Sequence, residues 1–399
     1  MKNKINLKNL ENLLNKRVFK KPFDSNFFSN HFGKKYLHKK DFLIDAKSVV
    51  SLKILDDMLS KSNIWNNHNF IMMLDQQKIN YNDYSSMSID TTGNNIRPDV
   101  DKVQRLVSKG ASIILNDIEK YNTNLLKISD ELQRLTQGRC QGNLYFSMAS
   151  HKAFGPHFDV HDVFAIHFEG EKVWNIYQNI EASPINHPVF RISPDERIKR
   201  AGKLIDQVTL RPGDLLYIPR GQYHDALASK NGAIHVAFGL TYFKAIDLMS
   251  TLWEKFILND FMRNDIGLSS NKEEMRSFLN KFSKEISNIV NTEETLEILN
   301  SNIKNWPYKI KEYSINNLVS EGIRYDIDKS VRFEKKDNKS YLISGKNAVE
   351  VPQKYSQLTE YILDKEFVTY NLLLQEFKDT SKKVINECLE NLSKMKVLK

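Results

Sequence analysis

The sequence predicts an α+β protein in which a β-rich body is followed by a helical region and then by a small mixed module. Short β-type runs begin near Leu144 and are separated by Gly, Pro and Asp, which is typical of an antiparallel barrel or sandwich. From about 243 the apolar residues change to helical spacing, and from about 318 strand-like pieces precede compact helical patterns. At 399 residues, the chain is long enough for about two to three domains.

The β-rich body is assigned to residues 1–242, with a helical N-terminal portion ahead of the strands. Each predicted strand combines β-branched, aromatic and aliphatic residues over a short span bounded by turn residues. The runs are LYFSM, DVFAIHF, EKVWNIY, LIDQVTL, DLLYIP and AIHVAFGLTY.

The helical region is assigned to residues 243–310. Its apolar side chains recur every three to five residues, as on one face of an amphipathic helix. They include Trp253, Phe256, Phe261, Phe278 and Phe282. This is more apolar surface than a solitary helical appendage needs, so we predict that the region forms a homodimer.

The last segment, residues 318–399, is predicted to be a winged-helix-like domain. Two strand-like pieces, VRFEK and KSYLIS, come before the helical patterns YSQLTEYIL, YNLLLQEF and KKVINECLENLSKMK. The last helix carries Glu387 and Glu390 among its lysines, which makes a poor surface for a phosphate backbone. We therefore expect a structural or partner-binding module, with no direct contact to nucleic acid.

Composition limits the class of protein. The chain is 41% hydrophobic and 27% charged, and its apolar runs are too short to cross a bilayer, so we expect no membrane association. The N-terminus lacks the apolar core of a secretory signal, and Cys140 and Cys388 have no partner spacing. We expect a cytoplasmic protein without disulfides, whose net charge of +9 fits an acidic partner such as RNA or a ribosome but equally serves solubility.

The stretch GPHFDVHD, residues 155–162, concentrates metal-binding side chains in a chain with only ten histidines. In a strand, alternate side chains share a face, so His157 and Asp159 point the same way. A third ligand, His224, follows the turn residues in LRPGDLLYIPRGQYHDA. Two imidazoles and one carboxylate on one face of an octahedral ion form the arrangement of non-haem Fe(II) oxygenases, which leaves coordination positions open for other molecules.

A lysine provides the charge that a dicarboxylate cosubstrate requires. The runs DVFAIHF and EKVWNIY flank Glu169 and Gly170, which predict a hairpin turn that brings Lys172 opposite His167. If the strand is unbroken from residue 157, then Lys172 shares the face of the metal ligands. A lysine inside a barrel needs an anionic partner, and the distal carboxylate of 2-oxoglutarate would provide one.

These motifs resemble the JmjC-type ribosomal oxygenases, which are cupin-like 2-oxoglutarate- and Fe(II)-dependent protein hydroxylases. The resemblance rests on NLYFS, on AFGPHFDVHDVFAIHFEGEKVWNIY and on LRPGDLLYIPRGQYHDA, and more weakly on the opening FFSNHFGKKYLHKK. It implies a double-stranded β-helix, also called a jelly roll, as the catalytic core, followed by a helical dimerisation region and a winged-helix-like domain.

The resemblance also assigns roles. It implies that His157, Asp159 and His224 bind iron, and that Lys172 and Asn143 hold 2-oxoglutarate, with dioxygen as the second cosubstrate. Tyr145 matches an aromatic hydroxyl of the substrate pocket, and the family's catalysis needs no residues beyond these ligands. Two positions depart from the family pattern. His167 replaces a glutamine, and Ala233 replaces a serine that several members have near the cosubstrate or the substrate.

Alternatives remain open from the sequence. His161 and Asp162 are interpreted as polar neighbours of the site, with Asp162 able to orient an imidazole, and His235 as a structural residue. The substrate is expected to be a protein or peptide, with a histidine or arginine of a ribosomal protein as the candidate. The same chemistry would serve a tailoring hydroxylase acting on a peptide or amino acid, and a metal-binding regulatory protein that contacts nucleic acid is the non-enzymatic alternative.

Overall fold

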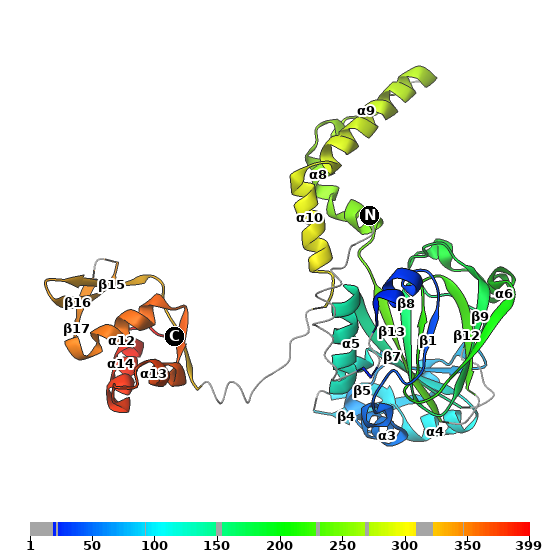
Figure 1. Cartoon of the computed structure of the whole chain (residues 1–399), viewed down its shortest axis with the longest axis horizontal. Helices are drawn as coiled ribbons and strands as arrows, with labels where there is room; N and C mark the ends of the chain where they lie inside the picture. The colour runs from blue at the N-terminus through cyan, green and yellow to red at the C-terminus, as the bar shows by residue number, and fades with distance from the viewer. Residues whose placement is uncertain are drawn as a thin grey trace. The chain divides into compact units, whose positions relative to one another are not determined.

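The computed structural model describes residues 19–20, 23–91, 93–148, 154–228, 232–267, 271–308, 322–345 and 347–399. The chain divides into two compact units, Met1–Lys309 and Ile310–Lys399. Where it is described, the first unit contains a larger and a smaller antiparallel sheet and a separate two-stranded pair, and helices cover part of the larger sheet (Figure 1). Within the described residues, no helix combines the length and the apolarity that crossing a membrane requires.

The larger sheet has eight strands and the smaller one has three. In spatial order, the larger sheet consists of β1 (Leu37–Lys39), β11 (Leu215–Ile218), β8 (Asp162–Glu169), β13 (Ala233–Thr241), β7 (Arg139–Ser147), β6 (Ser112–Asn116), β2 (Phe70–Leu74) and β3 (Gln77–Lys78). The smaller sheet consists of β10 (Leu204–Leu210), β9 (Lys172–Ile180) and β12 (Gln222–Ala228). From β8 to β13 the chain passes repeatedly between the sheets, with β8, β11 and β13 in the larger one and β9, β10 and β12 in the smaller one, as in a jelly roll.

Strand β8 explains how the two sheets pack. Val163 and Ala165 join an apolar cluster with residues of β9, β10 and β11, so they face the space between the sheets. Phe164 and Ile166 point to the opposite face and belong to the large cluster that includes the N-terminal segments. Both faces of β8 are therefore buried, and the continuous apolar run DVFAIHF follows from this burial.

The hairpin predicted at Glu169 and Gly170 is wrong. Strands β8 and β9 belong to different sheets, and Lys172 pairs in register with Leu210 and Ala228 instead of with His167. The chain crosses between the sheets at Gly170, which has a φ of +65°. A two-residue turn and a crossing between packed sheets have the same sequence pattern, because both need a residue that adopts left-handed backbone angles.

The N-terminal portion contains more strand than the sequence predicted. Strands β2 and β6 belong to the larger sheet, and β4 (Ser85–Asp90) pairs with β5 (Gly93–Pro98). The apolar runs of β2 (FIMML) and β6 (SIILN) do not alternate with polar residues, because these two strands are almost fully buried. The helical elements of this portion are η1 (Phe27–His31), α2 (Ala46–Val49), α3 (Leu52–Leu59), η2 (Ser62–Ile64), η3 (Tyr81–Asp83), α4 (Val100–Ser108), η4 (Ile118–Lys120) and α5 (Thr123–Thr136).

The connection between β9 and β10 carries two further short helices, and the predicted helical region follows β13. The connection holds η5 (Pro188–Phe190) and α6 (Pro194–Ala201). The helical region consists of α7 (Ala245–Thr251), α8 (Trp253–Leu258), η6 (Phe261–Arg263), α9 (Lys272–Val290) and α10 (Glu293–Lys304). After α10 the chain returns to the sheet, where the indole Nε1 of Trp306 donates a hydrogen bond of 2.8 Å to the carbonyl of Thr241.

The second unit has its own hydrophobic core. It contains the strand pair β14 (Arg324–Asp326) and β18 (Phe367–Thr369), the sheet of β15 (Val331–Lys336), β16 (Lys339–Ser344) and β17 (Asn347–Val351), and the helices α12 (Gln353–Asp364), α13 (Tyr370–Glu376) and α14 (Lys382–Lys394). Strands β15 and β16 and the three helices lie where the sequence indicated strand and helix. The classification of this unit as winged-helix-like stays a prediction.

Candidate metal centre

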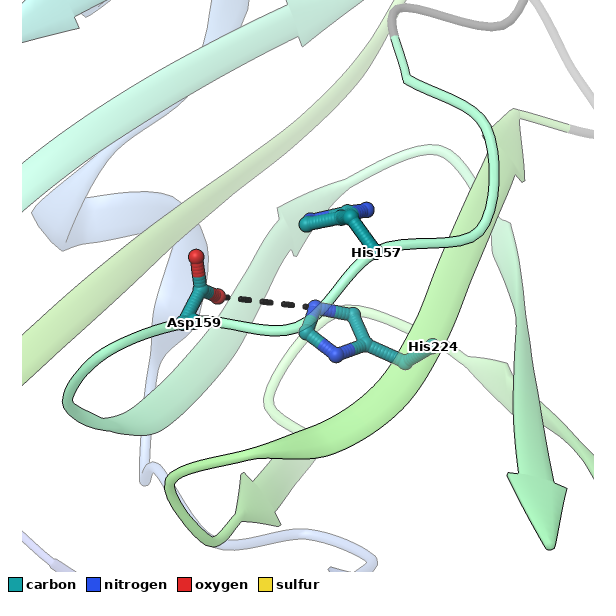
Figure 2. A group of neighbouring side chains, drawn as sticks. All are labelled: His157, Asp159 and His224. Carbon is teal, nitrogen blue, oxygen red and sulfur yellow. Dashed lines mark ion pairs between the residues drawn. The ribbon is translucent and has the colours of Figure 1, made fainter. Parts of the chain in front are cut away.

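His157, Asp159 and His224 come together at the edge between the two sheets (Figure 2). His157 and Asp159 lie on the segment that leads into β8 in the larger sheet, whereas His224 belongs to β12 in the smaller one. One ligand atom from each residue lies within 4.8 Å of the other two. Oδ2 of Asp159 is 3.6 Å from Nε2 of His224. This donor set is the one that the sequence predicted for the metal.

Backbone hydrogen bonds hold the three residues in place. His157 and His224 form an isolated antiparallel bridge, in which each amide donates to the other residue's carbonyl at 3.0 and 2.8 Å. The amide of Gly221 donates to the carbonyl of Asp159 at 3.0 Å. The ligands are therefore positioned by main-chain pairing, which is more rigid than a loop that carries free side chains.

Each imidazole is oriented by its second nitrogen. Nδ1 of His157 lies 2.8 Å from the carbonyl oxygen of Gly155, and Nδ1 of His224 lies 2.9 Å from that of Gln222. A proton on each Nδ1 satisfies these carbonyls, and the lone pair of each Nε2 is then available to a metal ion. Such backing by a carbonyl is typical of histidine ligands, because it fixes both the tautomer and the ring orientation.

The electrostatics of the site favour the forms that bind metal. Burial, together with neighbouring His157, lowers the pKa of His224 to about 4, so its imidazole is neutral near pH 7. Burial alone would raise the pKa of Asp159, but the imidazoles of His161, His157 and His224 outweigh it and lower that pKa. A neutral imidazole and an ionised carboxylate are the species that coordinate a divalent ion.

The ligands open into a cavity of about 320 Å³. Aromatic side chains form much of its wall, among them Phe154, Phe158, Trp174 and Phe190. Lys172 also lines the cavity, although its side chain is almost fully buried. Its Nζ lies 3.4 Å from Oγ of Ser147, and no ion pair links it to a carboxylate among the described residues. Burial lowers the pKa of Lys172 to about 7.

Tyr145 and Asn143 lie on β7, on the face that also carries Ser147. Tyr145 lines the cavity and stacks on the ring of His235 with centroids 4.7 Å apart. Asn143 does not line the cavity, but it pairs with the cavity residue Ala237 in register. Oδ1 of Asn143 is buried and lacks a hydrogen-bond partner among the described residues.

His161 and Asp162 do not belong to the cluster of metal ligands. His161 packs over Gly239, where an added Cβ would lie 2.4 Å from its ring. The carboxylate of Asp162 accepts hydrogen bonds from the hydroxyl of Tyr217 at 3.0 Å and from the amide of Arg220 at 2.8 Å. Asp162 therefore fixes the turn ahead of β12, and the idea that it orients an imidazole is wrong.

The two departures from the family pattern lie deep in the barrel. His167 is fully buried, and burial lowers its pKa to about 4. It pairs in register with His235, which lines the cavity next to Tyr145, so the interpretation of His235 as merely structural is too narrow. Ala233 is also fully buried and lies opposite Ser147, the residue that contacts Lys172.

The cavity residues that sequence reasoning did not assign to the site include Trp174, His235, Arg191 and Arg197. Alternation along β9 could have identified Trp174, because it lies two residues after Lys172 and so shares its face. His235 could have been found in the same way once β13 was paired with β7. The arginines gave no signal, because charged residues in a connection usually face solvent.

The three candidate ligands lie in a region that matches known proteins. The JmjC domain family matches residues 115–248, which include all three ligands. The chain is 29% identical over 204 residues to the bifunctional lysine-specific demethylase and histidyl-hydroxylase NO66 of Dictyostelium discoideum, and the match covers 51% of this chain and 37% of that protein. It is 30% identical over 151 residues to ribosomal oxygenase 2 of Bos taurus, with 38% of this chain and 30% of that protein covered.

A solved structure shows the same fold. The X-ray structure of YcfD from E. coli superposes with a TM-score of 0.51 at 15% identity, and the match covers 94% of this chain and 97% of that chain. At this identity the likeness shows the fold alone, and the assignment to the JmjC domain rests on the match to residues 115–248. The curated relatives extend the comparison to sequence, although the chain matches only 37% of the length of one and 30% of the length of the other.

Proposed function

Because the chain belongs to the JmjC-type ribosomal oxygenase family, we propose that it is a 2-oxoglutarate- and Fe(II)-dependent oxygenase that hydroxylates a protein side chain. The observation that carries the proposal is the group His157, Asp159 and His224, which opens into the same cavity as the buried Lys172. The proposed substrate is a ribosomal protein, since relatives are named as ribosomal oxygenases. Histidine and arginine are the candidate target residues.

The residues present fit the metal and the cosubstrate. Both imidazoles offer Nε2 once Nδ1 has donated to a backbone carbonyl, and Asp159 adds one charged oxygen. Lys172 has no carboxylate partner among the described residues, so the distal carboxylate of 2-oxoglutarate would supply the missing charge. Asn143 offers a buried amide next to the cavity as a further contact for the cosubstrate.

Each group of residues has a task in the reaction. When bound, Fe(II) and 2-oxoglutarate activate dioxygen, so that one oxygen atom enters a C–H bond while the cosubstrate becomes succinate and carbon dioxide. His157, Asp159 and His224 would hold the ion, and their ligand atoms open into the cavity, where the other reactants would bind. The aromatic wall excludes water from that side, and Tyr145 positions the substrate side chain at the open face.

Visible spectroscopy tests the proposal without a known substrate. Fe(II) and 2-oxoglutarate are added in the absence of oxygen, and the wild-type protein should develop a visible charge-transfer band. His157→Ala should abolish the band because it removes a ligand. His161→Ala is the matched control, since it removes a nearby imidazole outside the ligand group, and it should keep the band. A wild-type protein without the band, or an unchanged band in His157→Ala, would refute the assignment.

We also propose that the helical region forms a homodimer. Met275, Leu279 and Phe282 follow one another at helical spacing along α9 and are 51%, 59% and 38% exposed. Trp253 on α8 is 62% exposed. Apolar side chains that line up on one exposed face favour burial against a second copy, because a closed twofold contact covers the same face on both subunits.

A further inference from the structure

The connection between β9 and β10 places two arginines at the cavity. Arg191 directly follows η5, and Arg197 lies in the middle of α6. Both line the cavity, which Phe190 and the metal ligands also line. Arg191 is exposed and Arg197 is half-buried, so the two guanidinium groups belong to the open part of the cavity.

These guanidinium groups have no acidic partner among the described residues. Nε of Arg197 donates to the carbonyl of Ile192 at 3.1 Å, which fixes the side chain without neutralising it. Two nearby acids, Glu196 and Glu181, are engaged elsewhere. Arg200 forms ion pairs with Glu196 at 2.8 Å and with Glu181 at 3.9 Å.

The charges of the cavity do not balance once the proposed ligands are present. Asp159 is the only carboxylate among the described residues that line the cavity, which also include the cations Lys172, Arg191 and Arg197. The charges of Fe(II) and 2-oxoglutarate cancel, and the charge of Asp159 cancels that of Lys172. The two arginines therefore remain uncompensated where a substrate must enter.

We propose that Arg191 and Arg197 bind a carboxylate of the substrate protein beside the hydroxylated residue, and that this residue is uncharged and not an arginine. The inference rests on the proposed function and chooses between its two candidate targets. A guanidinium matches a carboxylate through paired hydrogen bonds. An arginine side chain in the same opening would meet two like charges at close range, which acts against binding. A neutral imidazole meets no such repulsion and has the flat shape that the aromatic wall accommodates.

A degenerate peptide library tests this inference by binding alone. The peptides carry His, Arg, Asn or Lys at the centre and random residues at the three positions on each side. The full-length protein is immobilised with Mn(II) and 2-oxoglutarate, and the retained peptides are sequenced. Peptides with central His and flanking Asp or Glu should be enriched about fivefold, the gain expected for a partly exposed ion pair. Central Arg should be depleted.

Variants show whether the two arginines cause the preference. Arg191→Gln combined with Arg197→Gln should remove the preference for Asp and Glu, and the corresponding double change to Glu should reverse it toward Lys and Arg. Arg200→Gln is the matched control, because it removes a cation from α6 that does not line the cavity, and it should leave the preference unchanged. Circular dichroism confirms that each variant is folded.

The outcomes separate this inference from the proposed function. Equal enrichment of central Arg and His, or an acidic preference that survives the double Gln change, overturns the role of the arginines even if the charge-transfer band is present. A missing band refutes the oxygenase and leaves the peptide preference as an independent measurement. If the band is present, mass spectrometry of the enriched peptides should show a gain of one oxygen on the central histidine when 2-oxoglutarate, Fe(II) and oxygen are supplied.

Discussion

The buried Lys172 lowers the stability of the folded protein when no anionic ligand is bound to it. A lysine normally has a pKa near 10.4, and burial lowers that of Lys172 to about 7. Between these values the unfolded chain binds a proton that the folded protein does not. The free energy of unfolding therefore rises with pH across this range. Conversely, the folded protein becomes less stable as the pH falls from about 10 to about 7, because Lys172 must then bind a proton in a buried position.

Replacing Lys172 with methionine should remove this pH dependence. The wild-type protein without ligands should gain up to about 1.4 kcal/mol of unfolding free energy per pH unit between pH 7.5 and 9.5 relative to Lys172→Met. Denaturant unfolding at each pH measures the difference. Lys199→Met, on an exposed position of α6, is the control and should follow the wild type. Parallel profiles for wild type and Lys172→Met would contradict a buried, titrating lysine.

The same residue should determine affinity for the cosubstrate. Lys172→Met leaves the metal ligands intact but removes the cation that the distal carboxylate needs. We expect 2-oxoglutarate to bind about 30-fold more weakly, which corresponds to about 2 kcal/mol for a buried charge-assisted contact. Titration of the visible band with 2-oxoglutarate gives the affinity, and pyruvate, which lacks the distal carboxylate, is the control ligand. Its binding should change much less. An equal loss of affinity for both ligands would show that Lys172 does not bind the distal carboxylate.

Residue patterns predicted the composition of the site but not its full lining. The spacing of His157 and Asp159 and the turn before His224 indicated the donors, because metal chemistry restricts which residue types can serve. Arg191 and Arg197 could not be predicted in the same way. Their position depends on how the β9–β10 connection folds over the cavity, and that fold leaves no periodic signal in the sequence.

At the level of elements, the turn at Gly221 connects the site with the fold. Gly221 has a φ of +87°, and a Cβ there would lie 2.1 Å from the carbonyl oxygen of Glu181. Its amide donates to the carbonyl of Asp159, and β12 with His224 begins at the next residue. The turn needs glycine for two reasons, since a side chain is excluded both by backbone angle and by space.

Gly221→Ala should disturb stability and metal binding together. We expect a loss of about 3 kcal/mol, because the strained backbone adds to the displacement of a neighbouring carbonyl. Gly213→Ala is the matched control. It also has a positive φ, of +93°, but its added Cβ would lie 3.6 Å from the nearest atom, so only the strain of about 1 kcal/mol should remain. Thermal unfolding and Mn(II) titration measure both effects. Equal losses of stability in Gly221→Ala and Gly213→Ala would show that the contact with the carbonyl of Glu181 is not the cause.

Elements were predicted well where local pattern and burial agree. The runs of β8, β9, β10, β11 and β13 were identified because they are rich in strand-forming residues between clear turns. Strand β12 was missed because QYHDALA contains several polar residues, one of which, His224, faces the candidate metal site. Strand pairing was also mispredicted at Gly170, since partners are chosen by sheet packing, which is a non-local property.

For the whole molecule, the division into two units makes a prediction about independent folding. The core of the second unit draws on β16, β17, β18, α12, α13 and α14 and includes Leu358, Ile362 and Leu389. A core of this kind supports cooperative unfolding of the fragment 322–399 on its own. Leu389→Ala should lower its stability by about 3 kcal/mol. Circular dichroism during heating measures both, and a fragment that melts without a transition would contradict the prediction.

The proposed homodimer is the second prediction at this scale. Leu279→Glu places a charge in the exposed apolar stripe of α9 and should convert the dimer into a monomer, because a buried unpaired carboxylate opposes association. Asn280→Glu introduces the same charge at a neighbouring exposed position outside that stripe, and it should remain dimeric. Light scattering at micromolar concentration distinguishes the two. A monomeric wild-type protein would refute the dimer.

The backbone bridge between His157 and His224 has a consequence for how the molecule opens. It joins the segment entering the larger sheet to a strand of the smaller one. A metal ion bound by the side chains of these residues would join the two sheets at the same edge a second time. Loading the ion should therefore slow hydrogen exchange at the amides of His157, Gly221 and His224 far more than at β2 or β6. Exchange rates along this edge would then report metal occupancy in preparations where no substrate is known.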